Sequence, residues 1–152
     1  MKKIYSFLLL CMLALTLQAT TYSGTLPIMY IQTENNAPIV SKDDYLNATY
    51  YVDALGISGY ENIGSAAAPL TMEIKGRGNY TWTGFNKKPY RIKLTEKQSL
   101  LGMKKSKHFA LLAHADDALN KKGFMRNQVG FELSRLIGIS WTPETKPVEV
   151  VL

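Results

Sequence analysis

Two runs of alternating apolar and polar residues, joined by a glycine-containing loop, constrain the fold more than any other feature of the sequence. In the runs 70–75 and 90–94, every second residue is apolar. A period of two is typical of a strand with one buried face. Arg91 and Lys93 fall on the opposite face of the second strand, about 7 Å apart. We therefore predict two strands, the first of which leads directly into Gly76-Arg77-Gly78.

The connection between these strands concentrates glycines, cations and aromatic rings. Residues 73–94 read Glu-Ile-Lys-Gly-Arg-Gly-Asn-Tyr-Thr-Trp-Thr-Gly-Phe-Asn-Lys-Lys-Pro-Tyr-Arg-Ile-Lys-Leu. Glycine permits close backbone approach, so Gly76-Arg77-Gly78 predicts a tight loop with exposed amides that suits an anion. The alternative is an ordinary turn, with Trp82 and Phe85 packed in the core and the lysines solvated, because a short glycine pattern alone is common.

Positive charge is concentrated in the same part of the chain. Between Lys75 and Lys107, ten Lys and Arg residues stand against one acid, Glu96. A basic block of this kind favours a surface that faces phosphate, nucleic acid, acidic polysaccharide or membrane lipid. Lysines that serve only to keep a sheet face soluble are the alternative.

The N-terminal residues have the pattern of an export signal. The chain opens with Met-Lys-Lys, continues with the apolar run Ile4–Leu17 and reaches the small residue Ala19. We predict a signal peptide over 1–19 and a mature domain over 20–152 that is secreted or at the cell surface. The apolar run is shorter than the ~20 residues that span a bilayer, so no stable membrane span is expected after cleavage. Cys11 is the only cysteine, and the mature domain is expected to lack disulfides and thiolate metal ligands.

The remaining pattern predicts an α+β fold, a mostly antiparallel sheet with one main helix. Further strands are expected at 26–31, 44–52, 109–113 and 148–152, and a loop at 54–68. The helix is predicted over 124–137, and its apolar stripe is Met125, Val129, Leu133, Leu136 and Ile137. Gly138 predicts a Schellman-type end. Because an apolar strand without a polar tail would be left unpaired at 148–152, we expect the chain to be a truncated fragment of a longer protein.

Few residues of this chain have the spacing of metal ligands. His108 and His114 flank the strand at 109–113 without a suitable neighbour, which favours surface or capping roles. Asp116-Asp117 either caps a helix or holds a divalent cation. Arg126 lies in the first turn of the predicted helix, where the dipole disfavours a cation, so a nearby acid or a bound anion is expected. No metal site is predicted.

A series of short motifs, taken in order, resembles the CotH (spore coat protein H) kinase family. The motifs are Ile-Lys-Gly-Arg-Gly-Asn-x-Thr-Trp (74–82), Lys-Lys-Pro-Tyr-Arg-Ile-Lys-Leu (87–94), Ser-Leu-Leu-Gly-Met (99–103), Phe-Ala-Leu-Leu-Ala (109–113), Asp-Asp (116–117), Met-Arg-Asn (125–127) and Val-Glu-Val (148–150). Each is weak alone, and their order is specific. Two departures are Tyr80, in place of a small residue, and a longer link at 118–124.

The resemblance implies the N-terminal part of an atypical protein-kinase-like fold. It further implies secreted or coat-associated enzymes that transfer phosphate from ATP, with Mg2+, to Ser or Thr of surface or extracellular proteins. The implied cofactor-binding residues of this chain are Lys75, Gly76, Arg77, Gly78, Asn79, Arg91, Lys93 and Arg126. Among them, Lys93 is similar to the strand lysine that kinases place on the nucleotide phosphates. Glu132 is a possible ion-pair partner for that lysine.

The catalytic half of a kinase site is expected elsewhere. A kinase also needs a catalytic carboxylate and metal-holding Asp or Asn residues, which in this fold come from a later lobe, so the catalytic residues are unknown and this piece alone is expected to be inactive. The alternative function is a non-catalytic surface or coat module that binds acidic glycans or partner proteins. Nucleic acid is not expected as a partner of an exported protein.

Overall fold

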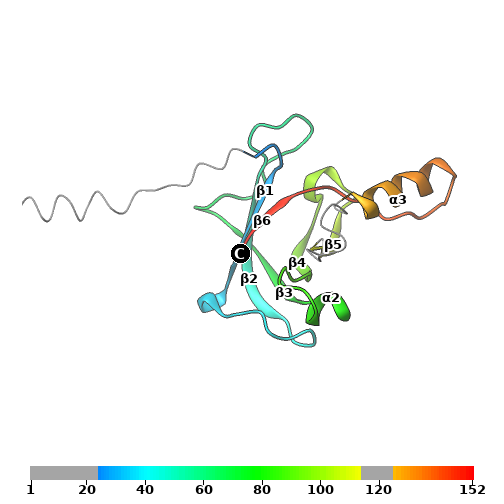
Figure 1. Cartoon of the computed structure of the whole chain (residues 1–152). Coiled ribbons are helices and arrows are strands. Elements are labelled where there is room, and N and C mark those ends of the chain that lie inside the picture. Colours follow the sequence, from blue (N-terminus) through cyan, green and yellow to red (C-terminus); the bar gives the residue numbers. More distant parts are fainter. Residues whose placement is uncertain (1–23, 114–124) are drawn as a thin grey trace, which may run out of the picture.

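The computed structural model describes residues 24–113 and 125–152 and is built around a six-stranded sheet in the order β5-β4-β3-β2-β1-β6 (Figure 1). The strands are β1 (Ile28–Thr33), β2 (Leu46–Asp53), β3 (Leu70–Gly76), β4 (Tyr90–Gln98), β5 (Ser106–Leu111) and β6 (Glu149–Val151). The helical elements are η1 (Glu34–Asn36), α2 (Tyr80–Thr83), η2 (Leu100–Gly102) and α3 (Arg126–Leu136). The pairs from β1 to β5 are antiparallel, and β6 alone runs parallel to its neighbour β1. The predicted α+β class is confirmed.

The two alternating runs form β3 and β4, as their period of two predicts. The strands pair antiparallel with Ile74 directly opposite Ile92, and both side chains are 0% exposed. Burying an isoleucine side chain stabilises the fold by about 1.5–3 kcal/mol. This register also fixes which polar residues of β3 and β4 meet on the other face.

The hydrophobic core lies on one face of the sheet. It contains Met29, Ile31, Ala48, Tyr50, Val52, Met72, Ile74, Ile92, Leu94, Leu100 and Leu101. Leu100 and Leu101 come from η2, and half-buried residues of the loops, among them Tyr60, Ile63 and Met103, pack against the same cluster. Loops and turns cover this face, whereas the polar side chains on the opposite face of the sheet are exposed or half-buried.

The strand positions agree with the sequence except at the edges. The strands predicted at 26–31 and 44–52 are found within two residues as β1 and β2, and 54–68 is a loop that touches β2 through a single bridge at Ile63. The strand predicted as buried at 109–113 is instead β5, none of whose residues is buried. The reason is its place at the edge of the sheet, where it pairs only with β4.

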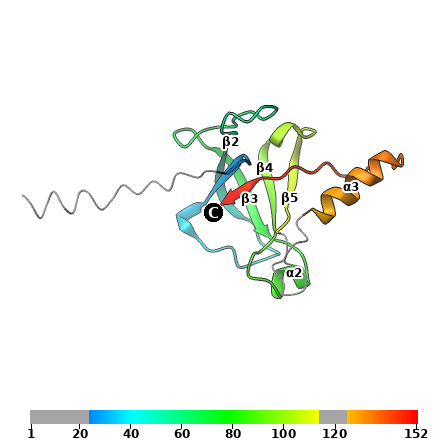
Figure 2. The same cartoon turned by 45° about the horizontal axis from the view of Figure 1, so that its top comes forward.

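Helix α3 is found where it was predicted, but its apolar stripe is not covered. Met125, Val129 and Leu133 are 56%, 59% and 56% exposed, and no residue of the helix is buried. In Figures 1 and 2 the helix extends away from the sheet. Its end is the predicted Schellman motif: Gly138 has φ +80° and donates to the Arg135 carbonyl, and Ile139 donates to the Ser134 carbonyl.

The last strand is paired, contrary to the expectation of an unpaired strand. β6 lies beside β1 with Val150 opposite Met29, and the Glu149 amide donates to the Pro27 carbonyl over 2.9 Å. The predicted signal peptide lies outside the described residues, as do His114 and Asp116-Asp117. In the part of the chain that the structure describes, no helix is long and apolar enough to cross a membrane.

Candidate functional site

Three of the predicted cations meet on the polar face of β3 and β4. In the antiparallel register, Lys75 of β3 stands opposite Arg91 of β4, and Glu73 stands opposite Lys93. Arg91 is exposed, and Lys75 and Lys93 are half-buried. Directly opposed residues on one face have Cβ atoms about 4.5–5.5 Å apart. The hairpin therefore brings Lys75, Arg91 and Lys93 into one cluster at the end of the sheet that carries the glycine loop.

Lys93 is held by an acid of the neighbouring strand. Its Nζ donates to Glu73 Oε2 over 2.6 Å. The hydrogen bond to Glu73, followed by the attraction of its charge, raises the pKa of Lys93 above its ordinary value. Glu132, the partner suggested by analogy, instead forms an ion pair within α3 with Arg135, so that suggestion is wrong. Since an ammonium has three N–H donors, the bond to Glu73 leaves Lys93 able to donate to a ligand.

The amides of the glycine loop are only partly exposed. The Gly76 amide donates to the Ser41 carbonyl and the Arg77 amide to the Pro89 carbonyl, over 2.9 and 3.1 Å. The prediction of exposed amides is therefore wrong for these two residues, because the loop is paired with backbone on both sides. Within the described residues, the amides of Gly78 and Asn79 donate no hydrogen bond. Gly78 has φ +90°, a conformation that favours glycine.

The aromatic residues after the loop explain why position 76 is a glycine. A Cβ at Gly76 would lie 2.6 Å from Cη2 of Trp82, so the indole packs directly against the glycine backbone. Trp82 belongs to α2, a helical turn that the sequence reading missed, and its ring meets Tyr90 edge-on at 6.2 Å. Lys88 donates to the Trp82 carbonyl over 2.6 Å. Trp82 and Phe85 are half-buried beside the loop and are not members of the core cluster.

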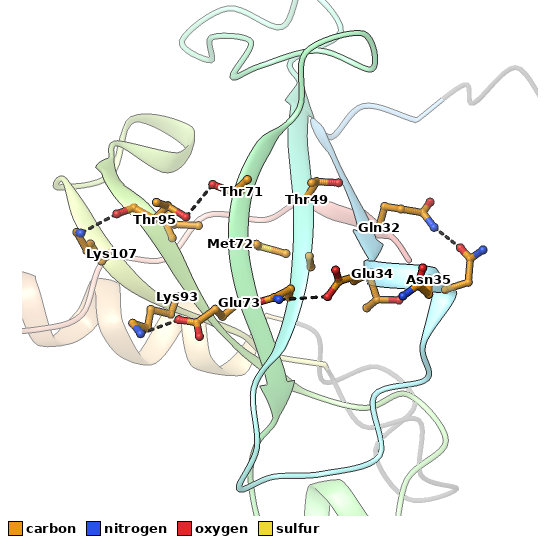
Figure 3. Close-up of a pocket in the computed structure, with 15 residues that line it drawn as sticks. Gln32, Glu34, Asn35, Thr49, Thr71, Met72, Glu73, Lys93, Thr95 and Lys107 are labelled. Carbon is orange, nitrogen blue, oxygen red and sulfur yellow. Dashed lines mark hydrogen bonds and ion pairs between the residues drawn. The ribbon is translucent and has the colours of Figure 1, made fainter.

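A large open hollow of about 830 Å³ lies on the same polar face (Figure 3). Its lining includes hydroxyl and amide side chains, among them Gln32, Asn35, Asn47, Thr49, Thr71 and Thr95. Of the predicted site residues, only Lys93 lines it, and Figure 3 shows Lys93 and Glu73 pointing toward each other there. Lys93 thus links the hollow to the cation cluster.

One predicted residue is not brought to this cluster. Arg126 begins α3 and is exposed, and within the described residues no hydrogen bond or ion pair joins it to the glycine loop or to Lys93. Asp116 and Asp117, the nearby acids that could pair with Arg126, lie outside the described residues.

The residues present fit phosphate better than a metal ion. Lys75, Arg91, Lys93 and the amides of Gly78 and Asn79 are all donors, and a polyanion needs donors and positive charge. Over 24–113 and 125–152, no group of three or more His, Cys, Asp or Glu side chains could hold a metal ion. Two site residues are not indicated by a sequence motif. Glu73 stands opposite Lys93 in the hairpin register, and the ring centre of Tyr45 lies 4.5 Å from Lys75 Nζ.

Comparison with known protein families gives a match over the second half of the chain. The sequence model of the family described as CotH kinase protein matches residues 74–152, which include the end of β3, the glycine loop, Arg91 and Lys93. The search of curated proteins and the search of solved structures gave no match. Because the family match covers more than half of the chain, the protein belongs to the CotH kinase family.

Proposed function

We propose that this chain supplies the nucleotide-phosphate side of a secreted CotH-family protein kinase that uses ATP and Mg2+ to phosphorylate Ser or Thr of surface or extracellular proteins. The observation that carries the proposal is the meeting of Lys75, Arg91 and Lys93 beside the glycine loop, within the range that matches the family. The N-terminal pattern of a signal peptide supports export.

The residues of the cluster have complementary roles in this proposal. Lys93, kept charged by Glu73, donates to phosphate oxygens, and Lys75 and Arg91 neutralise further charge. In this proposal the amides of Gly78 and Asn79, which donate no hydrogen bond within the described residues, are the loop donors to the anion. Phosphoryl transfer depends mainly on positioning and on stabilisation of charge, which cations and amides on a rigid hairpin provide.

Bound ATP with Mg2+ would supply the transferable phosphoryl group. Transfer also needs carboxylates that hold the metal and accept the substrate proton. The resemblance assigns these carboxylates to a later lobe of the fold, so we expect no phosphate transfer from this chain alone. Robust transfer from labelled ATP by residues 20–152 would contradict that expectation.

Calorimetric titration with Mg-ATP tests the proposed site. We expect saturable binding by the wild type and a loss of about tenfold or more in Lys93→Ala, because a hydrogen bond to a charged group contributes about 1.5–3 kcal/mol. Lys97→Ala is the matched control, since Lys97 lies on the same strand and is exposed. Its affinity should stay within about twofold of the wild type. Equal losses in both variants would show that only overall charge matters.

The same variants separate the kinase function from the non-catalytic alternative. Lys75 and Arg91 lie on an accessible sheet face that can also take an acidic glycan. Binding of a sulfated polysaccharide that is indifferent to Lys93→Ala, together with no binding of ATP, would favour a surface module over a kinase.

A further inference from the structure

The segment 41–45 precedes β2 and lies outside the range that matches the family, yet four of its five residues contact the candidate site. The Ser41 carbonyl accepts from the Gly76 amide over 2.9 Å. Lys42 Nζ donates to the Gly78 carbonyl over 3.2 Å. The Asp43 carbonyl accepts from Lys75 Nζ, also over 3.2 Å. Each contact joins the segment to the glycine loop or to the strand that leads into it.

The segment has a defined conformation of its own. The Ser41 hydroxyl accepts from the amides of Asp43 and Asp44, both over 3.0 Å, and donates to the Asp44 carboxylate over 3.1 Å. Side-chain bonds of this kind fix the backbone as a turn. The turn therefore presents the next residue, Tyr45, in a set position over the sheet.

Tyr45 is the point where two cations of the site converge. Lys75 Nζ lies 4.5 Å from the centre of its ring, and Lys93 Nζ lies 5.8 Å from the same centre. The face of an aromatic ring attracts cations. Two ammonium groups repel each other. An aromatic ring that attracts both offsets part of this repulsion, which the pairing of the strands does not do. Glu73 holds Lys93 from the side, and Tyr45 provides the surface beneath both lysines.

We propose that Tyr45 is a positioning residue that gathers Lys75 and Lys93 for contact with a single polyanion, which makes the segment 41–45 part of the anion site. The identity of the polyanion as ATP rests on the proposed function, whereas the positioning of the lysines does not. The tyrosine acts through its ring, and its hydroxyl is not required.

The first test measures binding of tripolyphosphate and of Mg-ATP to the full chain by calorimetry. Tyr45→Leu removes the ring, and Tyr45→Phe keeps it. We expect Tyr45→Phe to bind within about twofold of the wild type and Tyr45→Leu to bind about 5- to 10-fold more weakly, in line with one cation–π contact or two. Wild-type affinity in Tyr45→Leu, or an equal loss in both variants, would overturn the inference. Tyr45→Met, which fills a similar volume without a ring, replaces Tyr45→Leu if that variant does not fold.

A second measurement is independent of any ligand. In NMR spectra, ε-protons of Lys75 above the ring should be shifted upfield by its ring current, and this shift should persist in Tyr45→Phe and vanish in Tyr45→Leu or Tyr45→Met. If the shifts follow this pattern and the wild type binds tripolyphosphate but not Mg-ATP, the proposed function fails and the positioning role stands. Binding of neither probe would overturn both. If the wild type shows no such shift, the positioning role fails whatever the affinity for ATP.

Discussion

Replacement of Gly76 by alanine tests whether this glycine is needed for packing against Trp82. An added Cβ would lie 2.6–2.8 Å from three carbon atoms at the outer edge of the indole. Real Cβ atoms do not approach so closely, so the indole or the end of β3 must move. The indole is restrained by the edge-on contact with Tyr90, and the Gly76 backbone is restrained by its bond to Ser41. Movement of the indole weakens its contact with Tyr90, and movement of the backbone weakens the hydrogen bond to Ser41.

The expected cost follows from the behaviour of overpacked sites. Inserting a methyl group into a well-packed place costs about 1–3 kcal/mol. For a chain of this size, that cost lowers Tm by roughly 2–12 °C. Gly130→Ala is the matched control, because Gly130 lies in α3 with nothing within 4 Å of its added Cβ. In an exposed helix the same change should be neutral or stabilising by about 0.5–1 kcal/mol.

Urea unfolding of a double-mutant cycle isolates the contact. Trp82→Phe shortens the side chain at the edge that faces Gly76, so Gly76→Ala should cost less than about 0.5 kcal/mol in that background. A Gly76→Ala variant as stable as the wild type would refute the packing explanation. So would an equal cost in both backgrounds, which would point to the backbone conformation of the loop instead.

Three further predictions compare buried and exposed side chains. Burial raises the pKa of Tyr50 from 10.0 to about 12, so the unfolded chain loses the proton first and stability falls as pH rises from 10 toward 12. Tyr50→Phe should therefore lose about 1 kcal/mol less stability than the wild type between pH 8 and pH 11. Urea unfolding at the two pH values measures this, and an equal fall of the urea midpoint in both proteins would contradict the prediction. Ile92→Ala should cost about 2–5 kcal/mol because its side chain is 0% exposed. Leu133→Ala, at a side chain 56% exposed, should change the unfolding free energy by less than about 0.5 kcal/mol.

The sequence predicts the central hairpin well because its pattern and its energetics agree. A period of two places Ile74 and Ile92 in the core, and it places Arg91 and Lys93 together on the other face. The analogy with kinases indicates Glu132 of the helix as the partner of Lys93, whereas the antiparallel register puts Glu73 opposite Lys93. An ion pair across a hairpin forms between neighbouring strands and needs no contact with a distant helix.

Other features depend on contacts that no local pattern reports. The apolar stripe of α3 has the period of a helix with one apolar face. This period identifies the apolar face, but it does not predict whether another element covers that face, and in the structure the stripe is exposed. The contacts of the segment 41–45 join residues 30 or more positions apart, and its residues have no motif that indicates them. Trp82 covers the glycine loop, whereas the alternative of an ordinary turn would have packed it in the core.

The parallel pairing of β1 with β6 has a consequence for the order in which the sheet forms. Ile28 and Glu149 are partners about 120 positions apart, whereas Gly76 and Tyr90 close a hairpin of about 14. Closing the longer loop costs about 2 kcal/mol more in chain entropy. During synthesis β1 can pair with β2 early, but its second edge must wait until residues 149–151 have emerged. The sheet is therefore completed by the strand pairing that joins the most distant parts of the sequence.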